Sequence, residues 1–329
     1  SHGVLYVGNT EGVLEYDGRQ WRRIPIAHQS RIRSLAIDDN DVLYVGGVGE
    51  IGYLAPDASG FLRYHSLLER LRPEDQNLGE VWRTFVVGPW VYFQTDARLI
   101  AAPRHDLAGA APLRVWRPQT SFHAMFAVGD TLLVRQRHIG LQILKGDSLE
   151  LLPGGEAFAE RGLSDLVRYD ARRWLITTRI HGLYLYDGKT LTPFAEANQD
   201  FFAENQVYDA LPLPDGRIAL GTLYSGVALL DRNGRLTQVI NKAAGLQDEN
   251  VWYMMLAQDG ALWLALESGL TRVEVASPFT LFNEAFGLRG AAVAVTRHRG
   301  RLYVSTTQGV LTLVDGAFQP VEGVYNKCW

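Results

Sequence analysis

The sequence is poor in cysteine, in charge of one sign and in long apolar runs. Cys328 is the only cysteine, so no disulfide can form within the chain. The 32 basic and 36 acidic residues leave a formal net charge of −4, which gives no reason to expect a polyanion such as nucleic acid as a partner. No apolar run approaches the length of a membrane span. The composition, with 47% hydrophobic residues, instead indicates a globular protein stabilised by a large core.

Glycine and aromatic residues are abundant, and their distribution indicates strands joined by tight turns. There are 33 glycines, 8 tryptophans and 14 tyrosines. In the stretch GLQDENVWYMMLAQDGALWLALESGLTRVE, residues 245–274, two apolar runs flank the turn QDG. Each run is too short for a helix and is rich in aromatic or apolar types that favour strands, so the stretch predicts a β-hairpin.

The hairpin pattern recurs seven times along the chain. The copies start at residues 32, 81, 122, 163, 207, 251 and 291, with spacings of 40 to 49 residues. This period is typical of the four-stranded blade of a β-propeller, whose strands we call a to d from the centre outward. Dipeptides such as Asp259-Gly260 and Asp187-Gly188 lie at the expected a–b and c–d turns, where both central residues need positive φ.

The sequence therefore predicts an all-β fold, a β-propeller of seven or eight four-stranded blades. We expect one propeller domain over residues 1–329, with units starting near residues 5, 32, 81, 122, 163, 207, 251 and 291, as a fragment of a longer protein. The first unit, Leu5–Ile26, has strands b, c and d but no strand a. Eight blades would require Val324–Trp329 to supply the missing strand, and a seven-bladed ring with leftover strands is the alternative.

The stretch from residue 245 to 274 resembles the two-component regulator propeller repeat. Gly245-Leu246, Asp259-Gly260, Leu262-Trp263-Leu264 and Gly269-Leu270 match the repeat's pattern, whereas Ala265 departs from the usual glycine. In the unit that starts at Val81, Arg98 stands where the glycine of strand c is expected. The similarity extends over essentially the whole chain.

This resemblance implies a sensor rather than an enzyme. Propellers of that family are the periplasmic or otherwise extracytoplasmic part of a membrane-anchored signalling protein, and they bind a ligand without catalysis. The expected partners are a small molecule, the signalling domains of the same polypeptide (a histidine kinase, a nucleotide cyclase or a helix-turn-helix regulator) and a second copy through the full-length protein. No cofactor and no metal is expected.

The d–a and b–c loops share one face of a propeller, and they are the longer and more varied loops of this chain. Variable loops on a rigid scaffold are where binding usually occurs. Arg137 and Arg179 each lie three residues before the glycine of strand c, so they occupy equivalent positions in consecutive units. Two arginines at one rim would bind an acidic oligosaccharide through its carboxylate or sulfate groups. Alternatively, they are solvated or bond to backbone carbonyl groups.

The other candidate ligand-binding residues lie in the same loops or at the start of strands a. They are His138, His181, Tyr224, Glu267, Trp82 and Trp252. The two tryptophans could stack on a sugar ring, and packing between blades is the competing explanation. Four further tryptophans, Trp21, Trp116, Trp174 and Trp263, are expected in the core.

Two other functional classes remain open. A propeller enzyme of the streptogramin-lyase kind would use a histidine and a glutamate on the loop face, with His181 and Glu267 as candidates. A lactonase-type propeller would bind Ca²⁺, yet no acidic residue recurs at equivalent b–c positions, and the two loop histidines lack a third metal ligand. The third possibility is a scaffold that only presents surfaces to other proteins.

Overall fold

The computed structural model describes residues 3–275, 282, 284–314 and 316–325. Over these residues the chain forms eight antiparallel sheets, six with four strands and two with three. One α-helix, α1 (Gln199–Asn205), occurs in this described part. Short 3₁₀ helices lie in loops at Ala27–Gln29, Leu68–Arg70, Pro73–Asp75, Gly155–Phe158, Glu196–Asn198, Lys242–Ala244 and Glu284–Phe286.

The strands follow one another in sequence order within every sheet, as the repeat predicts. The first four sheets contain β1 (Leu5–Asn9), β2 (Gly12–Tyr16) and β3 (Trp21–Ile24); β4 (Ile32–Ile37), β5 (Leu43–Gly47), β6 (Ile51–Pro56) and β7 (Leu62–Ser66); β8 (Arg83–Val87), β9 (Trp90–Gln94), β10 (Leu99–Pro103) and β11 (Arg114–Trp116); and β12 (Phe122–Val128), β13 (Thr131–Gln136), β14 (Gly140–Lys145) and β15 (Ser148–Leu151).

The last four sheets continue this pattern. They contain β16 (Leu163–Arg168), β17 (Trp174–Thr178), β18 (Leu183–Tyr186) and β19 (Leu191–Phe194); β20 (Val207–Pro212), β21 (Ile218–Thr222), β22 (Val227–Leu230) and β23 (Leu236–Ile240); β24 (Val251–Leu256), β25 (Leu262–Leu266) and β26 (Gly269–Val273); and β27 (Ala292–His298), β28 (Arg301–Thr306), β29 (Gly309–Val314) and β30 (Ala317–Tyr325).

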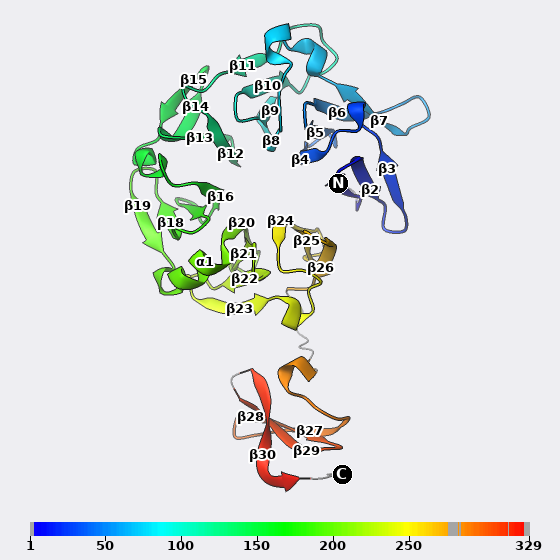
Figure 1. Ribbon diagram of the computed structural model, residues 1–329, viewed down its shortest axis with the longest axis vertical. Helices are drawn as coiled ribbons and strands as arrows, with labels where there is room; N and C mark the ends of the chain where they lie inside the picture. Colours follow the sequence, from blue (N-terminus) through cyan, green and yellow to red (C-terminus); the bar gives the residue numbers. More distant parts are fainter. Residues whose placement is uncertain (1–2, 276–281, 283, 315, 326–329) are drawn as a thin grey trace.

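Seven of the eight sheets are arranged as the blades of a β-propeller, so the predicted fold class is confirmed. The inner strands β1, β4, β8, β12, β16, β20 and β24 contact one another in that order around a ring, with the outer strands turned away from the centre (Figure 1). The sheet of β27–β30 is drawn outside this ring (Figure 1). Its inner strand β27 is exposed along its whole length, whereas β12 and β16 within the ring are largely buried.

The first blade is not closed in the way the eight-blade alternative requires. The sheet β1–β2–β3 has three strands, and Val324 and Tyr325 lie in β30, which pairs with β29. Tyr325 is opposite Gly309 in that pairing, so its backbone belongs to its own sheet. The prediction that Val324–Trp329 completes the first blade is wrong for these two residues, and residues 326–329 lie outside the described part.

A β-bulge near the start of the inner strands sets the geometry of the channel. The register shifts after the first residue in β4, β12, β16, β20 and β24. A bulge leaves one residue unpaired and turns its side chain away from the regular alternation of the strand. The residues at this shared position are Arg33, His123, Ser164, Tyr208 and Trp252.

The core lies between neighbouring blades. One cluster joins two consecutive sheets and contains Phe126 of β12, Ile176 of β17 and Phe158 of the 3₁₀ helix between the two blades. All three side chains are fully or almost fully buried. Burial of such side chains contributes roughly 1.5–3 kcal/mol each, so packing between blades is the main stabilising force. Of the four tryptophans expected in the core, Trp116, Trp174 and Trp263 are only half-buried. Trp21 is 47% exposed on the outermost strand of the first blade and stacks on Tyr16.

Candidate functional site

The b–c and d–a loops meet at one end of the channel, as the strand directions predict. The backbone N–H of Arg137 donates to the carbonyl of Ser121, and that of His138 donates to the carbonyl of Ala159. The N–H of Val207 likewise donates to the carbonyl of Arg179 in the preceding blade. These bonds fix the b–c loops against the segments that lead into strands a, and together they form the rim of the channel.

All eight residues predicted from the sequence have exposed side chains. They are Trp82, Arg137, His138, Arg179, His181, Tyr224, Trp252 and Glu267. The contacts divide this set into one connected group and several separate residues.

The connected group runs across three consecutive blades. The guanidinium carbon of Arg179 lies 5.5 Å from the ring centroid of Tyr208, and Tyr208 meets Trp252 edge to face at 5.1 Å. The indole Nε1 of Trp252 donates to Glu267 at 2.7 Å. We call Tyr208 and Trp252 the aromatic shelf. It has a cation at one end and a carboxylate at the other, and Trp252 is 40% exposed, so the shelf offers an aromatic surface to a ligand.

The remaining predicted residues lie apart from the shelf. Trp82 is 40% exposed and pairs with the guanidinium of Arg33 at 5.0 Å. His138 bonds through Nδ1 to Glu160 at 2.9 Å. The backbone of His181 accepts a bond from the phenol of Tyr184, and within the described residues no bond joins His181 to Glu267. His181 and Glu267, the candidate pair of a lyase-like enzyme, thus do not contact each other in the described part of the chain.

A cluster of basic side chains, most of them missed by sequence analysis, surrounds His123 at the mouth of the channel. We call Arg83, His123, Arg135, Arg137 and Arg179 the basic cluster; they come from β8, β12, β13 and two b–c loops. Burial lowers the pKa of His123, and the charges of the four arginines lower it further, to about 4. The two rim arginines therefore act on the same imidazole although they belong to different blades.

The hydrogen bonds of the basic cluster leave several donors unused. Arg135 is 3% exposed and donates through Nε and Nη2 to the carbonyls of Phe158 and Ala159, both at 2.8 Å. Its Nη1 and the Nδ1 of His123 are buried without a hydrogen-bond partner among the described residues. Neither guanidinium of Arg137 and Arg179 forms an ion pair in the described part of the chain. A buried donor without an acceptor is costly, and an anion would satisfy it.

A pair of buried aspartates lies deeper, on the next two inner strands. Asp165 of β16 and Asp209 of β20 are 8% and 9% exposed. Burial raises the pKa of Asp209 well above its usual value, and the neighbouring Asp165 charge raises it further. Arg83 reaches this pair from β8, with Nη1 3.6 Å from Asp165 and Nη2 donating to the carbonyl of Ser164 at 2.7 Å.

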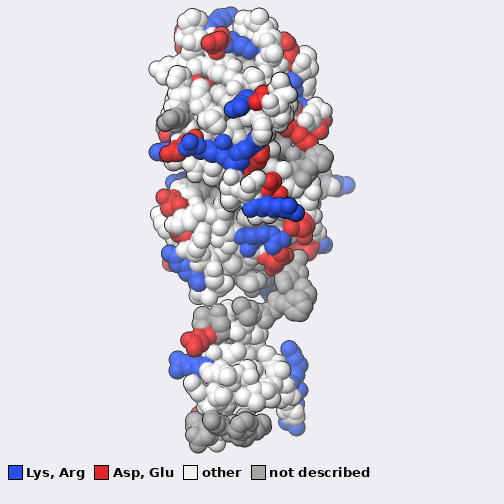
Figure 2. Space-filling view, turned by 90° about the vertical axis from the view of Figure 1, so that its right-hand side faces the viewer, with Lys and Arg blue, Asp and Glu red and all other residues white. Residues whose placement is uncertain are grey.

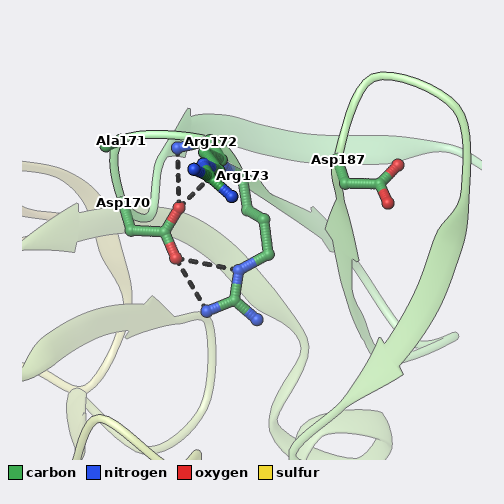
Figure 3. Close-up of a pocket in the computed structure, with 5 residues that line it drawn as sticks. All are labelled: Asp170, Ala171, Arg172, Arg173 and Asp187. Atoms are coloured by element: carbon green, nitrogen blue, oxygen red, sulfur yellow. Dashed lines mark hydrogen bonds and ion pairs between the residues drawn. The ribbon is translucent and has the colours of Figure 1, made fainter.

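On the opposite face, a carboxylate that lines a surface hollow is already engaged within the protein. A hollow there is lined by Asp170, Ala171, Arg172, Arg173 and Asp187 (Figure 3). The carboxylate of Asp170 is already occupied by the backbone of Arg172 and by both the backbone and the side chain of Arg173 (Figure 3). On the edge of the molecule seen in Figure 2, acidic and basic side chains are interspersed, in keeping with ion pairs such as Arg22–Glu15.

The chain is similar to the extracellular domains of hybrid two-component systems. The domain of BT3049 from B. thetaiotaomicron superposes with a TM-score of 0.71 at 17% identity, over 98% of this chain and 46% of that chain. The domain of BT4673 from the same organism gives 0.64 at 16% identity, over 98% of this chain and 44% of that chain. The chain thus spans less than half the length of these neighbours.

The chain is also similar to a propeller whose name refers to no two-component system. The WD40 propeller of Doa1 gives a TM-score of 0.59 at 15% identity, over 82% of this chain and 88% of that chain. No family model and no curated protein matches the sequence. No helix in the described residues is long and apolar enough to cross a membrane. At these identities the similarity shows the β-propeller fold.

Proposed function

We propose that this chain is a non-catalytic sensor propeller, the extracytoplasmic ligand-binding part of a longer signalling protein. Support comes from the sequence resemblance to the two-component regulator repeat and from the likeness to extracellular domains of hybrid two-component systems. The output would lie in signalling domains of the same polypeptide, and full-length copies would pair through the whole protein.

The ligand we propose is a small acidic molecule, in particular an oligosaccharide that carries carboxylate or sulfate groups. The observation that carries this proposal is that the charges of Arg137 and Arg179, in the b–c loops of consecutive blades, both act on His123, while neither guanidinium has an acidic partner in the described residues. Like charges held close repel each other, and an anion between them relieves the repulsion. The aromatic shelf beside Arg179 would stack on a sugar ring.

Calorimetric titration with acidic and neutral oligosaccharides of equal length tests this proposal. The Arg137→Ala/Arg179→Ala variant should bind the acidic ligand at least about tenfold more weakly, because hydrogen bonds to charged groups contribute about 1.5–3 kcal/mol each. An Arg172→Ala/Arg235→Ala variant removes the same charge from the turns of the opposite face and should bind normally. Equal affinity of wild type and the rim variant for the acidic ligand would refute the proposed role of the rim arginines.

A further inference from the structure

His123 occupies an unusual position for a histidine in the middle of a basic cluster. It is the bulge residue of β12, so its side chain leaves the regular alternation of that strand. Its backbone lies beside that of Arg135, because the flanking Ala124 pairs with Arg135, and the N–H of Arg137 donates to the carbonyl of Ser121 at 3.0 Å, two residues before it. The charges of Arg135 on β13, Arg137 in the β13–β14 loop, Arg83 on β8 and Arg179 in the β17–β18 loop all act on its imidazole. No acidic residue is among the charges that act most strongly on its imidazole.

Two carboxylates that act on members of this cluster are already engaged. Glu160 bonds to His138 at 2.9 Å, and Asp165 pairs with Arg83 at 3.6 Å. Within the cluster Arg83 is therefore paired with a carboxylate, whereas no acidic side chain pairs with Arg137 or Arg179 in the described residues. Two nitrogen atoms, Arg135 Nη1 and His123 Nδ1, remain buried without a hydrogen-bond partner in the described chain.

We infer that the basic cluster binds an oxyanion beside His123, Arg137 and Arg179, and that His123 takes up a proton when the anion binds. An anion there cancels the repulsion that keeps the imidazole neutral, and the imidazolium can then donate a hydrogen bond to it. This inference deepens the proposed function, on which it rests, because it assigns the acidic group of the ligand to the mouth of the channel and couples its binding to pH.

The direction of the pH effect follows from linkage. Without ligand the pKa of His123 is about 4, so the imidazole is neutral at pH 5 to 7. A bound anion raises this pKa, so the complex holds more protons than the free protein. Binding therefore tightens as the pH falls, by up to about tenfold per pH unit between the two pKa values.

Inorganic sulfate is a suitable probe because it stays fully ionised between pH 5 and pH 7. We expect its affinity for the wild-type chain, measured at constant ionic strength, to rise as the pH is lowered over this range. We also expect the imidazole resonance of His123, identified by its loss in His123→Gln, to titrate at higher pH when sulfate is present. His123→Gln should abolish the pH dependence, and the matched control His138→Gln should retain it.

Several outcomes would overturn the inference. They are absence of sulfate binding, affinity independent of pH, and pH dependence that survives in His123→Gln with its circular dichroism unchanged. An acidic oligosaccharide that needs Arg137 and Arg179 but leaves the His123 titration unaltered would keep the proposed function and refute this site. Proton-linked sulfate binding without oligosaccharide binding would support the site and refute the oligosaccharide as ligand.

Discussion

Single side chains in the channel join one blade to the next. The carboxylate of Asp165 accepts the backbone N–H of Ala210 at 3.1 Å, and that of Asp209 accepts the N–H of Met254 at 2.6 Å. The bulges at the start of β20 and β24 interrupt the local pairing of these strands, and the aspartates bond to N–H groups just beyond. The two residues therefore perform the same structural task at consecutive blade interfaces.

The raised pKa of Asp209 makes this task pH-dependent. An aspartate whose pKa is higher in the folded than in the unfolded protein stabilises the fold at low pH, and this contribution is lost as the pH rises through the folded-state pKa. Asp209→Asn resembles the protonated form, so it should match wild type near pH 3, below the usual pKa of an aspartate, and exceed its free energy of unfolding by about 1–3 kcal/mol near pH 9. Urea unfolding across this pH range measures the difference. Parallel pH profiles for the two proteins would show that Asp209 is ionised without penalty.

Arg98 explains how the third blade tolerates the loss of a glycine. Its guanidinium donates to Asp75 at 2.8 Å, to the carbonyl of Glu74 at 2.7 Å and to the carbonyl of Asn77 at 3.1 Å. These bonds tie the b–c loop of this blade to its d–a loop. The departure from the repeat pattern at this position is therefore a specific structural contact.

Removal of Arg98 should be costly because its partner is buried. The side chain of Asp75 is 2% exposed, and Arg117 is its only other described ion-pair partner. Arg98→Ala should lower the free energy of unfolding by about 3 kcal/mol, since it leaves a buried charge with half of its compensation. Lys145→Ala, which breaks the exposed pair with Glu150, should cost less than about 1 kcal/mol. Similar losses for both variants would mean that Asp75 is stabilised mainly by its remaining contacts.

At the scale of the blade, the glycine that opens strand c is required by two independent constraints. Gly226 has φ of 69°, and a Cβ atom there would lie 2.1 Å from the carbonyl oxygen of Ile240. Gly188, in a c–d turn, has φ of 98° but no heavy atom within 4 Å of such a Cβ. The two positions therefore separate the cost of backbone conformation from the cost of steric overlap.

Alanine substitution at these glycines should give different losses of stability. Gly188→Ala should cost about 1–2 kcal/mol, the usual penalty for a left-handed residue with a side chain. Gly226→Ala should cost about 1–3 kcal/mol more because the strand must move away from Ile240. Thermal or urea unfolding measures both, and equal losses would indicate that the blade accommodates the extra methyl group without strain.

Much of the blade architecture could be predicted from the sequence. Period, turn dipeptides and apolar runs predict second strands near residues 43–49, 132–135, 218–221 and 302–305, and β5, β13, β21 and β28 lie at these places. The bulges could not be predicted, because they depend on pairing between strands. His123, Arg83 and Arg135 were missed for that reason: each lies within a strand, where a sequence pattern indicates packing and does not show which residues converge on the channel.

At the scale of the whole molecule, the sheet of β27–β30 has a small core of its own. Its buried apolar residues are Val304, Leu311 and Phe318, and the partly buried residues packed on them all come from residues 282–313. The clusters of the ring draw on residues up to Val275. The described cores of the two parts are thus separate.

A chain that ends at residue 275 should therefore keep the stability of the ring. We expect its main thermal transition within about 2 °C of that of the full chain, because less than about 1 kcal/mol of ring stability depends on the removed sheet. Differential scanning calorimetry of both proteins measures this. A decrease of more than about 5 °C would show that the ring depends on contacts with residues beyond 275.

Hydrogen exchange measured with and without an acidic oligosaccharide tests the central claim, ligand binding at the mouth of the channel, most directly. A ligand held by Arg137 and Arg179 should slow exchange of the backbone amides in residues 137–140 and 179–182, because it orders these two loops. The turn at residues 170–173 on the opposite face serves as the internal reference and should not change. Protection confined to that opposite face, with both rim loops unaffected at saturating ligand, would contradict the proposed site.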